Sequence, residues 1–296
     1  MRKWMSHIIS VTIVATVLLT ASGVHAEQAQ SNPTNSPLAS NHDHLLKSNI
    51  SGWVSEIAKQ PSFESWKNAK FDVTPLGPGT HSWLAIVQGS KGVLGYLVIQ
   101  ALEDGGFVLG EYGLGSYLYN ETTLLQSMKQ LELIPSKSKS EILYVHPLLA
   151  VWKINSEWYI DAMSGELLPL DKKVLNAAMT NEQQFKSVGL SSGRKLKSSL
   201  SNPSFGPYAK LPWVVDKPMQ VSSTNSYKAV SSALDAKKQL RYTVERYNEQ
   251  MLYVWSVTGY HNWDETAFVA LETNELGESR RYIPLQLLTE LGQFYY

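Results

Sequence analysis

The chain of 296 residues contains no cysteine. Disulfides, thiolate metal ligands, a lipid-modified cysteine and a nucleophilic thiol are therefore all excluded. A chain without disulfides must be held together by packing alone, and this one is long enough to do so. Its 43% hydrophobic content, with nine Trp and fifteen Tyr, indicates packed cores rather than disorder.

The sequence also lacks a long hydrophobic run, because no segment approaches the roughly 18 apolar residues of a membrane-spanning helix. A shorter apolar run at residues 8–21 follows Arg2 and Lys3 and precedes Val-His-Ala at residues 24–26. This order is the layout of a cleavable export signal. We predict cleavage after Ala26, which leaves a secreted or cell-wall-associated chain with no transmembrane segment.

Excess charge of either sign is absent as well. Removing Arg2 and Lys3 from the 26 basic residues leaves 24 against 26 acidic residues, a net charge of −2. No global field draws such a chain to nucleic acid or anionic lipid, so we expect no nucleic-acid partner. Export without any cysteine is typical of Gram-positive bacterial secretomes, which is where we place the protein on composition.

Periodicity and turn residues divide the chain into five parts. We predict a signal peptide at 1–26, a flexible Ser- and Asn-rich spacer at 27–44, an α+β domain with antiparallel meanders at 45–170, a helix and Ser-rich basic linker at 171–207, and a smaller α+β domain at 208–296. Each domain has a helix followed by strands, so the expected fold class is α+β, with antiparallel sheets and packed helices.

The first domain has clear local signals. Apolar residues at helical spacing predict a helix at 46–57 that ends before Pro61, and Thr122 is expected to cap a later helix. Strands are expected at residues 81–87, 93–101, 107–112, 142–145, 150–154 and 157–161, with a further extended pair at 167–168.

The second domain repeats this plan. Helices are expected at residues 172–185, 225–239 and 285–291, and strands at residues 241–247, 251–258, 267–272 and 280–283. Pro284 and Gly292 bound the last helix, in the positions that proline and glycine prefer.

Two glycine-rich strings resemble catalytic or phosphate-binding motifs. Residues 189–193 match G-x-S-x-G, but the residues before them are polar and those after them open a helix poorly. Residues 110–115 lack the G-x-G-x-x-G spacing and the P-loop lysine. We therefore expect a linker and a shaped loop, and no cofactor.

The few histidines offer weak catalytic candidates. His81 follows a Pro- and Gly-rich breaker, and His261 lies in an expected aromatic loop at 259–264. With Glu111 or Asp264 either could form a general base, since a histidine needs a carboxylate or nucleophile within hydrogen-bond reach. His42 and His44 fall in the expected spacer, where metal ligands would not be fixed, so no metal site is expected.

Aromatic residues near these positions suggest a binding rim. Tyr112 ends a predicted strand, and Tyr260 and Trp263 flank His261. Tyrosine and tryptophan give a large contact area at low entropic cost. These three are the candidate ligand-binding residues.

Residues 151–168 contain Trp-Lys-Ile, then Trp-Tyr-Ile-Asp-Ala-Met-Ser-Gly-Glu-Leu-Leu. This stretch resembles the closing hairpin of PepSY-type domains, in which a strand ends in an Asp-Ala-x-x-Gly-Glu turn. PepSY-type modules are exported non-catalytic units, often attached to peptidases that they restrain. The resemblance implies binding or inhibition and transfers no catalytic residue.

Residues 253–260, which end in Val-Thr-Gly-Tyr, resemble the region around the histidine of C39-like cysteine peptidases. The family pattern places a histidine where this chain has Met251 and Leu252, and it requires a cysteine nucleophile. A degenerate relative is compatible with the sequence, whereas an active thiol peptidase is not.

The sequence therefore favours a secreted or wall-associated non-catalytic protein that binds an extracellular protein, a peptide or a cell-wall polymer. The alternative is a secreted hydrolase that acts through the histidines and carboxylates named above. Close approach of a histidine and a carboxylate in a pocket would distinguish the second reading from the first.

Overall fold

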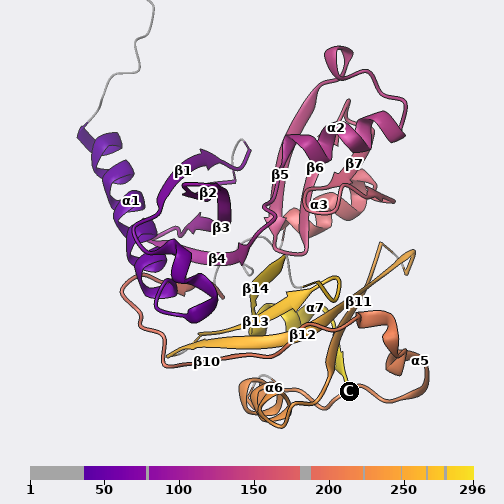
Figure 1. The fold of residues 1–296 in the computed structure, drawn as a ribbon. Coiled ribbons are helices and arrows are strands. Elements are labelled where there is room, and N and C mark those ends of the chain that lie inside the picture. Colours follow the sequence, from indigo (N-terminus) through magenta and orange to yellow (C-terminus); the bar gives the residue numbers. More distant parts are fainter. Residues whose placement is uncertain are drawn as a thin grey trace, which may run out of the picture.

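The computed structural model describes residues 37–77, 80–180, 188–222, 224–247, 249–264, 266–276 and 279–296, with side chains from Asn41 onward. The predicted export signal at 1–26 lies outside this range. Antiparallel strands form two sheets, and helices pack against them (Figure 1). The predicted α+β class is therefore confirmed.

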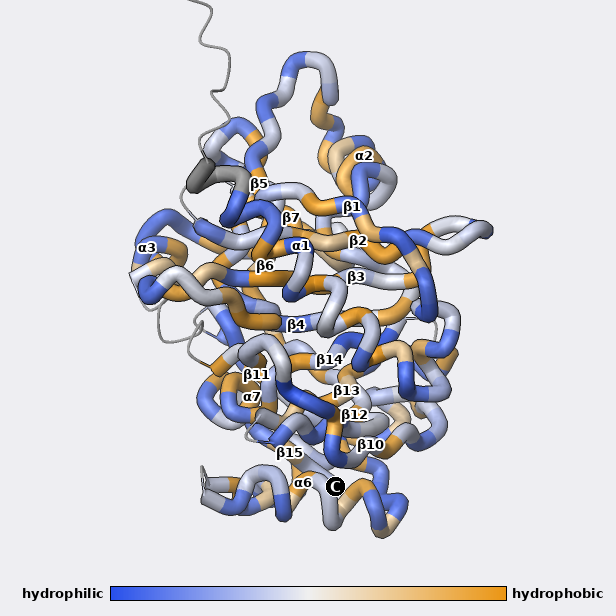
Figure 2. Tube along the Cα trace, turned by 90° about the vertical axis from the view of Figure 1, so that its left-hand side faces the viewer, coloured by the Kyte–Doolittle hydropathy of each residue, from blue (hydrophilic) through white to orange (hydrophobic). Residues whose placement is uncertain are grey.

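The larger sheet has eleven strands, and its main path runs β1–β2–β3–β4–β14–β13–β12–β11–β15, with β9 paired to β4 and β10 paired to β12. Figure 2 follows this order from β1 near the top to β12 near the bottom. The strands are Lys70–Pro75 (β1), Ser82–Gly89 (β2), Gly92–Ala101 (β3), Phe107–Leu114 (β4), Leu190–Ser191 (β9), Ser198–Ser201 (β10), Leu240–Arg246 (β11), Met251–Trp263 (β12), Thr266–Glu272 (β13), Arg280–Pro284 (β14) and Gln293–Tyr295 (β15).

The smaller sheet lies within the predicted first domain. Its strands are β5 (Ser140–His146), β6 (Leu149–Ile154), β7 (Trp158–Asp161) and β8 (Leu167–Leu168), paired in that order. The helices α2 (Glu121–Gln130) and α3 (Lys172–Thr180) pack against opposite faces of this sheet, through Leu124 and Leu175 respectively.

Helices cover both faces of the large sheet. On one face, α1 (Pro37–Ile57) and the short helix η1 (Pro61–Trp66) bury Trp53, Phe63 and Trp66 against the strands. On the other face, the small sheet covers β2 and β3, while α6 (Ser226–Asp235) and α7 (Leu285–Leu291) cover the C-terminal strands. The short elements η2 (Pro135–Lys137), η3 (Pro207–Ala209) and α5 (Pro212–Val215) lie in connections.

The large sheet runs across the predicted domain boundary. Strand β4 comes from the first region and pairs with β14, which comes from the last 20 residues of the chain; Tyr112 is opposite Tyr282. The predicted basic linker contributes β9 and β10 to the same sheet. The two predicted domains therefore share one continuous hydrogen-bonded sheet.

Three local expectations need correction. Helix α1 begins at Pro37, inside the predicted flexible spacer, and His42 on it contacts the rings of Trp83 and Phe107 at centroid distances of 5.7 and 4.9 Å. The cap of α2 is Asn120, whose Oδ1 accepts from the backbone of Thr122 at 2.8 Å, not Thr122 itself. Each difference comes from a contact that sequence spacing does not reveal.

The third correction concerns the length of strand β12. Residues 259–264 were expected to form a loop, but β12 continues through Trp263 because β10 and β13 pair with it on both sides. Gly259 makes this possible, since a Cβ there would overlap the carbonyl of Leu200 on β10.

We therefore expect opposite effects from adding a methyl group at two glycines. Gly259→Ala should lower the free energy of unfolding by about 1–3 kcal/mol, because β10 must move away from β12. Gly52→Ala should raise it by about 0.5–1 kcal/mol, because this glycine lies in α1 with no atom within 4 Å of the added Cβ. Urea unfolding of both variants measures this; a gain in stability at Gly259 would contradict the close approach of β10, and a loss at Gly52 would contradict the open space beside α1.

Candidate functional site

Glu111 lies on β4 with no exposed surface, and it is the centre of a buried polar network. Its Oε2 accepts from Nη2 of Arg281 at 2.7 Å and from the hydroxyl of Tyr96 at 3.0 Å. Its Oε1 accepts from the hydroxyl of Tyr144 at 3.1 Å. Arg281 also donates to the carbonyl of Pro147 at 2.6 Å, so the ion pair joins β3, β4 and β14 to the small sheet.

The charge state of this network is fixed by its surroundings. Burial alone would lower the pKa of Arg281, but the adjacent charge of Glu111 raises it above its ordinary value. Burial raises the pKa of Tyr144 and of Tyr96, so both hydroxyls remain protonated donors. Each oxygen of Glu111 thus already accepts a hydrogen bond, which indicates a structural role.

His261 lies on the opposite face of the large sheet, in a stack of aromatic rings. Trp263 donates from Nε1 to the hydroxyl of Tyr112 at 3.4 Å, and that hydroxyl lies 2.7 Å from Nδ1 of His261. Tyr282 stacks on Tyr112 and on His261, with ring centroids 4.9 and 4.2 Å apart. The whole group is packed under Phe63 of η1, in the core below α1.

This setting keeps His261 neutral. Burial, and then the charge of Arg280, lowers the pKa of His261 to about 3. A neutral imidazole can accept the Tyr112 proton at Nδ1, which matches the direction of donation from Trp263. Since Glu111 and Tyr112 are neighbours on one strand, their side chains point to opposite faces, and Glu111 cannot reach His261.

The other predicted catalytic residues are also apart. His81 is exposed just before β2, with φ of 47°. Asp264 follows β12 and forms an ion pair with Lys197 at 2.7 Å. In the part of the chain described by the structure, no carboxylate hydrogen-bonds to His81 or His261, and no group of three metal-ligating side chains occurs.

The predicted aromatic rim is buried. Tyr112 and Trp263 belong to the stack described above, and Tyr260 donates from its hydroxyl to Asp235 at 3.2 Å. Tyr227 on α6 packs edge-on against Tyr260, at 5.6 Å between centroids. Because strand residues alternate between faces, these aromatic rings reinforce two cores instead of forming one surface.

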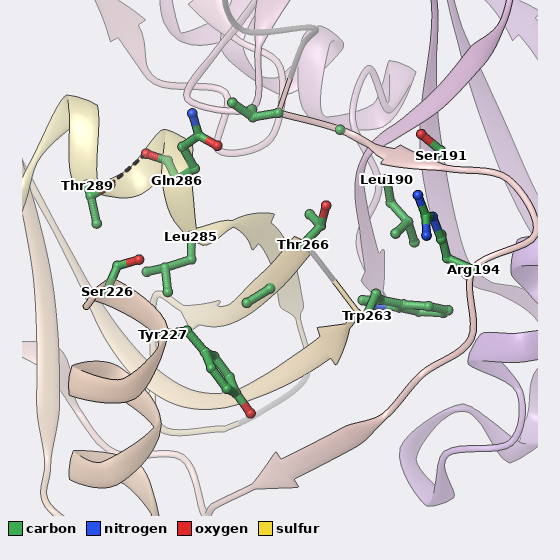
Figure 3. Close-up of a pocket in the computed structure, with 13 residues that line it drawn as sticks. Leu190, Ser191, Arg194, Ser226, Tyr227, Trp263, Thr266, Leu285, Gln286 and Thr289 are labelled. Atoms are coloured by element: carbon green, nitrogen blue, oxygen red, sulfur yellow. Dashed lines mark hydrogen bonds between the residues drawn. The ribbon is translucent and has the colours of Figure 1, made fainter. Parts of the chain in front are cut away.

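A pocket of about 460 Å³ lies between the large sheet, α6 and α7. Figure 3 shows side chains from four separate segments arranged around its open centre. The lining residues are Val188, Gly189, Leu190, Ser191, Arg194, Ser226, Tyr227, Trp263, Thr266, Ala267, Leu285, Gln286 and Thr289. The sequence pointed to Trp263 as a binding candidate and to residues 189–193 as a motif that we rejected. It gave no sign of the lining residues on α6 and α7, because hydroxyl and amide residues on distant segments carry no local signal.

The pocket chemistry is that of binding. Hydroxyl and amide groups line it together with Arg194 and the rings of Tyr227 and Trp263, and none of the described lining residues is a histidine or carboxylate. Ser191, from the G-x-S-x-G string, lies here on β9, but no helix follows β9 and no general base adjoins it. A nucleophile elbow needs both, so the arrangement does not activate this serine.

The Glu111–Arg281 pair should dominate the stability of the fold. Glu111→Gln should lower the free energy of unfolding by about 3–5 kcal/mol, because Arg281 then stays buried without a counter-ion. As a control, Glu64→Gln breaks the exposed Glu64–Lys67 pair on η1 and should cause no measurable change. Urea denaturation compares the two, and equal effects would show that Glu111 has no structural role.

Stability should also fall with acid because of His261. The unfolded chain takes up a proton near pH 6.5, whereas the folded protein does so only near pH 3, so unfolding becomes easier as the pH falls between these values. In His261→Phe the slope of unfolding free energy against pH should decrease by up to about 1.4 kcal/mol per pH unit. Urea titrations from pH 7.5 to pH 4 measure this slope. An unchanged slope would mean that His261 takes up its proton at the same pH in the folded protein as in the unfolded chain.

Comparison with known proteins does not assign the chain to a family. No protein-family model matches the chain. No curated protein and no solved structure matches it significantly either. Function is therefore inferred from the side chains of this molecule alone.

Proposed function

We propose that this chain is an exported, non-catalytic binding protein, and that the pocket between the large sheet, α6 and α7 holds part of its ligand. The observation that carries the proposal is the composition of the described pocket wall, which offers aromatic surface, hydroxyls and an amide without an acid–base pair. Ordinary ligand sites combine apolar surface with a few placed polar groups in this way.

The ligand class follows from the same wall. Tyr227 contributes aromatic surface, and Ser226, Thr266 and Gln286 contribute hydrogen-bond donors and acceptors. Such a lining suits a segment of peptide or cell-wall polymer, which presents apolar and hydrogen-bonding groups together. We propose the extracellular side as its location, on the basis of the signal-like residues 1–26.

Restraint of an extracellular peptidase is a narrower form of this proposal. Strands β6, β7 and β8 form an antiparallel unit over the PepSY-like residues 151–168. Trp158 and Leu167, at the ends of this unit, are 36% and 39% exposed and are available to a protein partner. A peptidase is therefore one partner to seek among secreted proteins. In the described part of the chain, no helix has the length and apolar character required to cross a bilayer.

Filling the pocket should abolish binding. The chain from Glu27 onward, which contains every described residue, is immobilised and exposed separately to purified cell-wall sacculi and to culture-supernatant proteins. Gln286→Trp places a large ring in the pocket from an exposed position on α7 and should weaken capture at least about tenfold, or about 1.4 kcal/mol.

Gln126→Trp is the matched control, because Gln126 is an exposed glutamine on α2, away from the pocket. It should bind like the parent chain. Equal capture by both variants would remove the pocket from the proposal, and no capture by the parent chain from either source would overturn the binding function itself.

A further inference from the structure

An exposed apolar tip projects beside the C-terminus, on α5 and the residues around it (Figure 1). It consists of Tyr208, Leu211, Val214, Val215 and Tyr296, all at least half exposed. Val214 and Val215 are 68% and 81% exposed. Four of the five border one groove of about 460 Å³, so the apolar surface is continuous. Continuous exposed apolar surface of this kind marks a contact site rather than a random surface residue.

The tip is held firmly at its base. Before it, the carbonyl of Pro207 accepts from Nε of the buried Arg241 at 2.8 Å, and Arg241 also lies over the ring of Phe205. After it, the backbone of Met219 donates to the carbonyl of Phe294 at 2.7 Å. Pro212 is buried beneath the turn. The fold therefore fixes both ends of the segment and leaves its most apolar residues outside.

Charges of both signs surround the tip, with the positive ones in slight excess. Lys210 and Lys217 flank α5 in sequence, against the single carboxylate of Asp216 within residues 207–218. Lys238 lies over the ring of Tyr296, with Nζ 4.4 Å from the centroid. Asp216 borders the same groove as Lys210 and the apolar side chains, and the charge of Glu166 acts on Tyr208. Three lysines against two carboxylates give the apolar projection a small net positive charge, and we call these lysines its cationic collar.

We propose that this tip inserts into the surface of an anionic lipid bilayer. Apolar side chains on a projecting turn reach the boundary between headgroups and acyl chains, and the aromatic pair Tyr208 and Trp213 suits the headgroup level. Each lysine of the collar then gains from the negative surface. A stable protein dimer needs about 800 Å² of complementary surface on each partner, and a single projecting turn is a small part of such an area.

The site is separate from the pocket, whose lining residues it does not share. Membrane attachment would hold the protein on the extracellular face of the membrane, while the pocket stays free for its ligand. The proposal goes beyond the proposed binding function, and the two fail or succeed in different assays.

Vesicle sedimentation tests the inference. The chain from Glu27 onward is mixed with vesicles of phosphatidylglycerol and phosphatidylcholine in equal parts, and with phosphatidylcholine vesicles alone. Binding is expected only to the anionic vesicles and should fall as salt is added. The double variant Val214→Ser, Val215→Ser should lower the partition coefficient at least about tenfold, because two exposed apolar side chains are lost.

The control variant is Leu252→Ser, Leu276→Ser, which removes apolar residues that are 40% and 68% exposed on other parts of the surface. It should bind like the parent chain. Lys210→Gln, Lys217→Gln keeps every apolar residue and should lower binding to anionic vesicles about fivefold for each lysine. This second variant keeps the test valid if the serine variant fails to fold by circular dichroism.

Absence of binding to anionic vesicles, or an equal loss in the control variant, would overturn the proposal. Light scattering of the protein without vesicles tests the alternative, that the tip binds a second copy of this chain. A dimer that dissociates when Val214 and Val215 are replaced, with no vesicle binding, would assign the tip to a second copy of this chain instead.

Discussion

The buried ion pair between Glu111 and Arg281 is the interaction on which the architecture depends. It joins residues 170 positions apart, and its hydrogen bonds reach both sheets. A carboxylate without exposed surface is costly unless all its acceptor sites are used, and here two tyrosines and one guanidinium use them. The pair therefore fixes how the small sheet sits on the large one, and it requires β4 and β14 to be neighbours.

The neighbouring Arg280 also pairs with a buried glutamate, on the other face of β14. Its guanidinium forms an ion pair with Glu272 and donates to Ser201 on β10. Two consecutive arginines thus point to opposite sides of one strand, and each finds a buried glutamate. Glu111, which was a candidate for chemistry, thus serves to place strands, and this leaves the pocket as the surface for recognition.

Local sequence signals predicted the elements well where neighbours in the chain determine them. Helix α7 has the predicted bounds Leu285–Leu291, and strands β2 to β4 lie within a few residues of their predicted ranges. The short edge strands β1 and β15 were not predicted, because each exists through pairing with one partner strand. A strand at 259–263 could not be recognised either, since β10 and β13 must both be present to extend it.

The surroundings of the candidate residues also depend on contacts between segments that are distant in the sequence. Tyr112 and Trp263 have polar residues or glycine beside them in the sequence, which gives no sign of their burial, and the stack that joins them to His261 and Tyr282 brings together three strands. The pocket was beyond prediction for the same reason, because Ser191, Ser226 and Gln286 are far apart in the chain. Periodicity predicts which face of an element is apolar, but not which distant face it meets.

The position of β14 at the centre of the large sheet has a consequence for the order of folding. Strand β4 presents an open edge until residues 280–284 arrive, so the N-terminal strands cannot complete their sheet on their own. Contacts of such long sequence separation form late and slowly. During synthesis, this edge of the sheet would therefore stay open until nearly all of the 296 residues have been added.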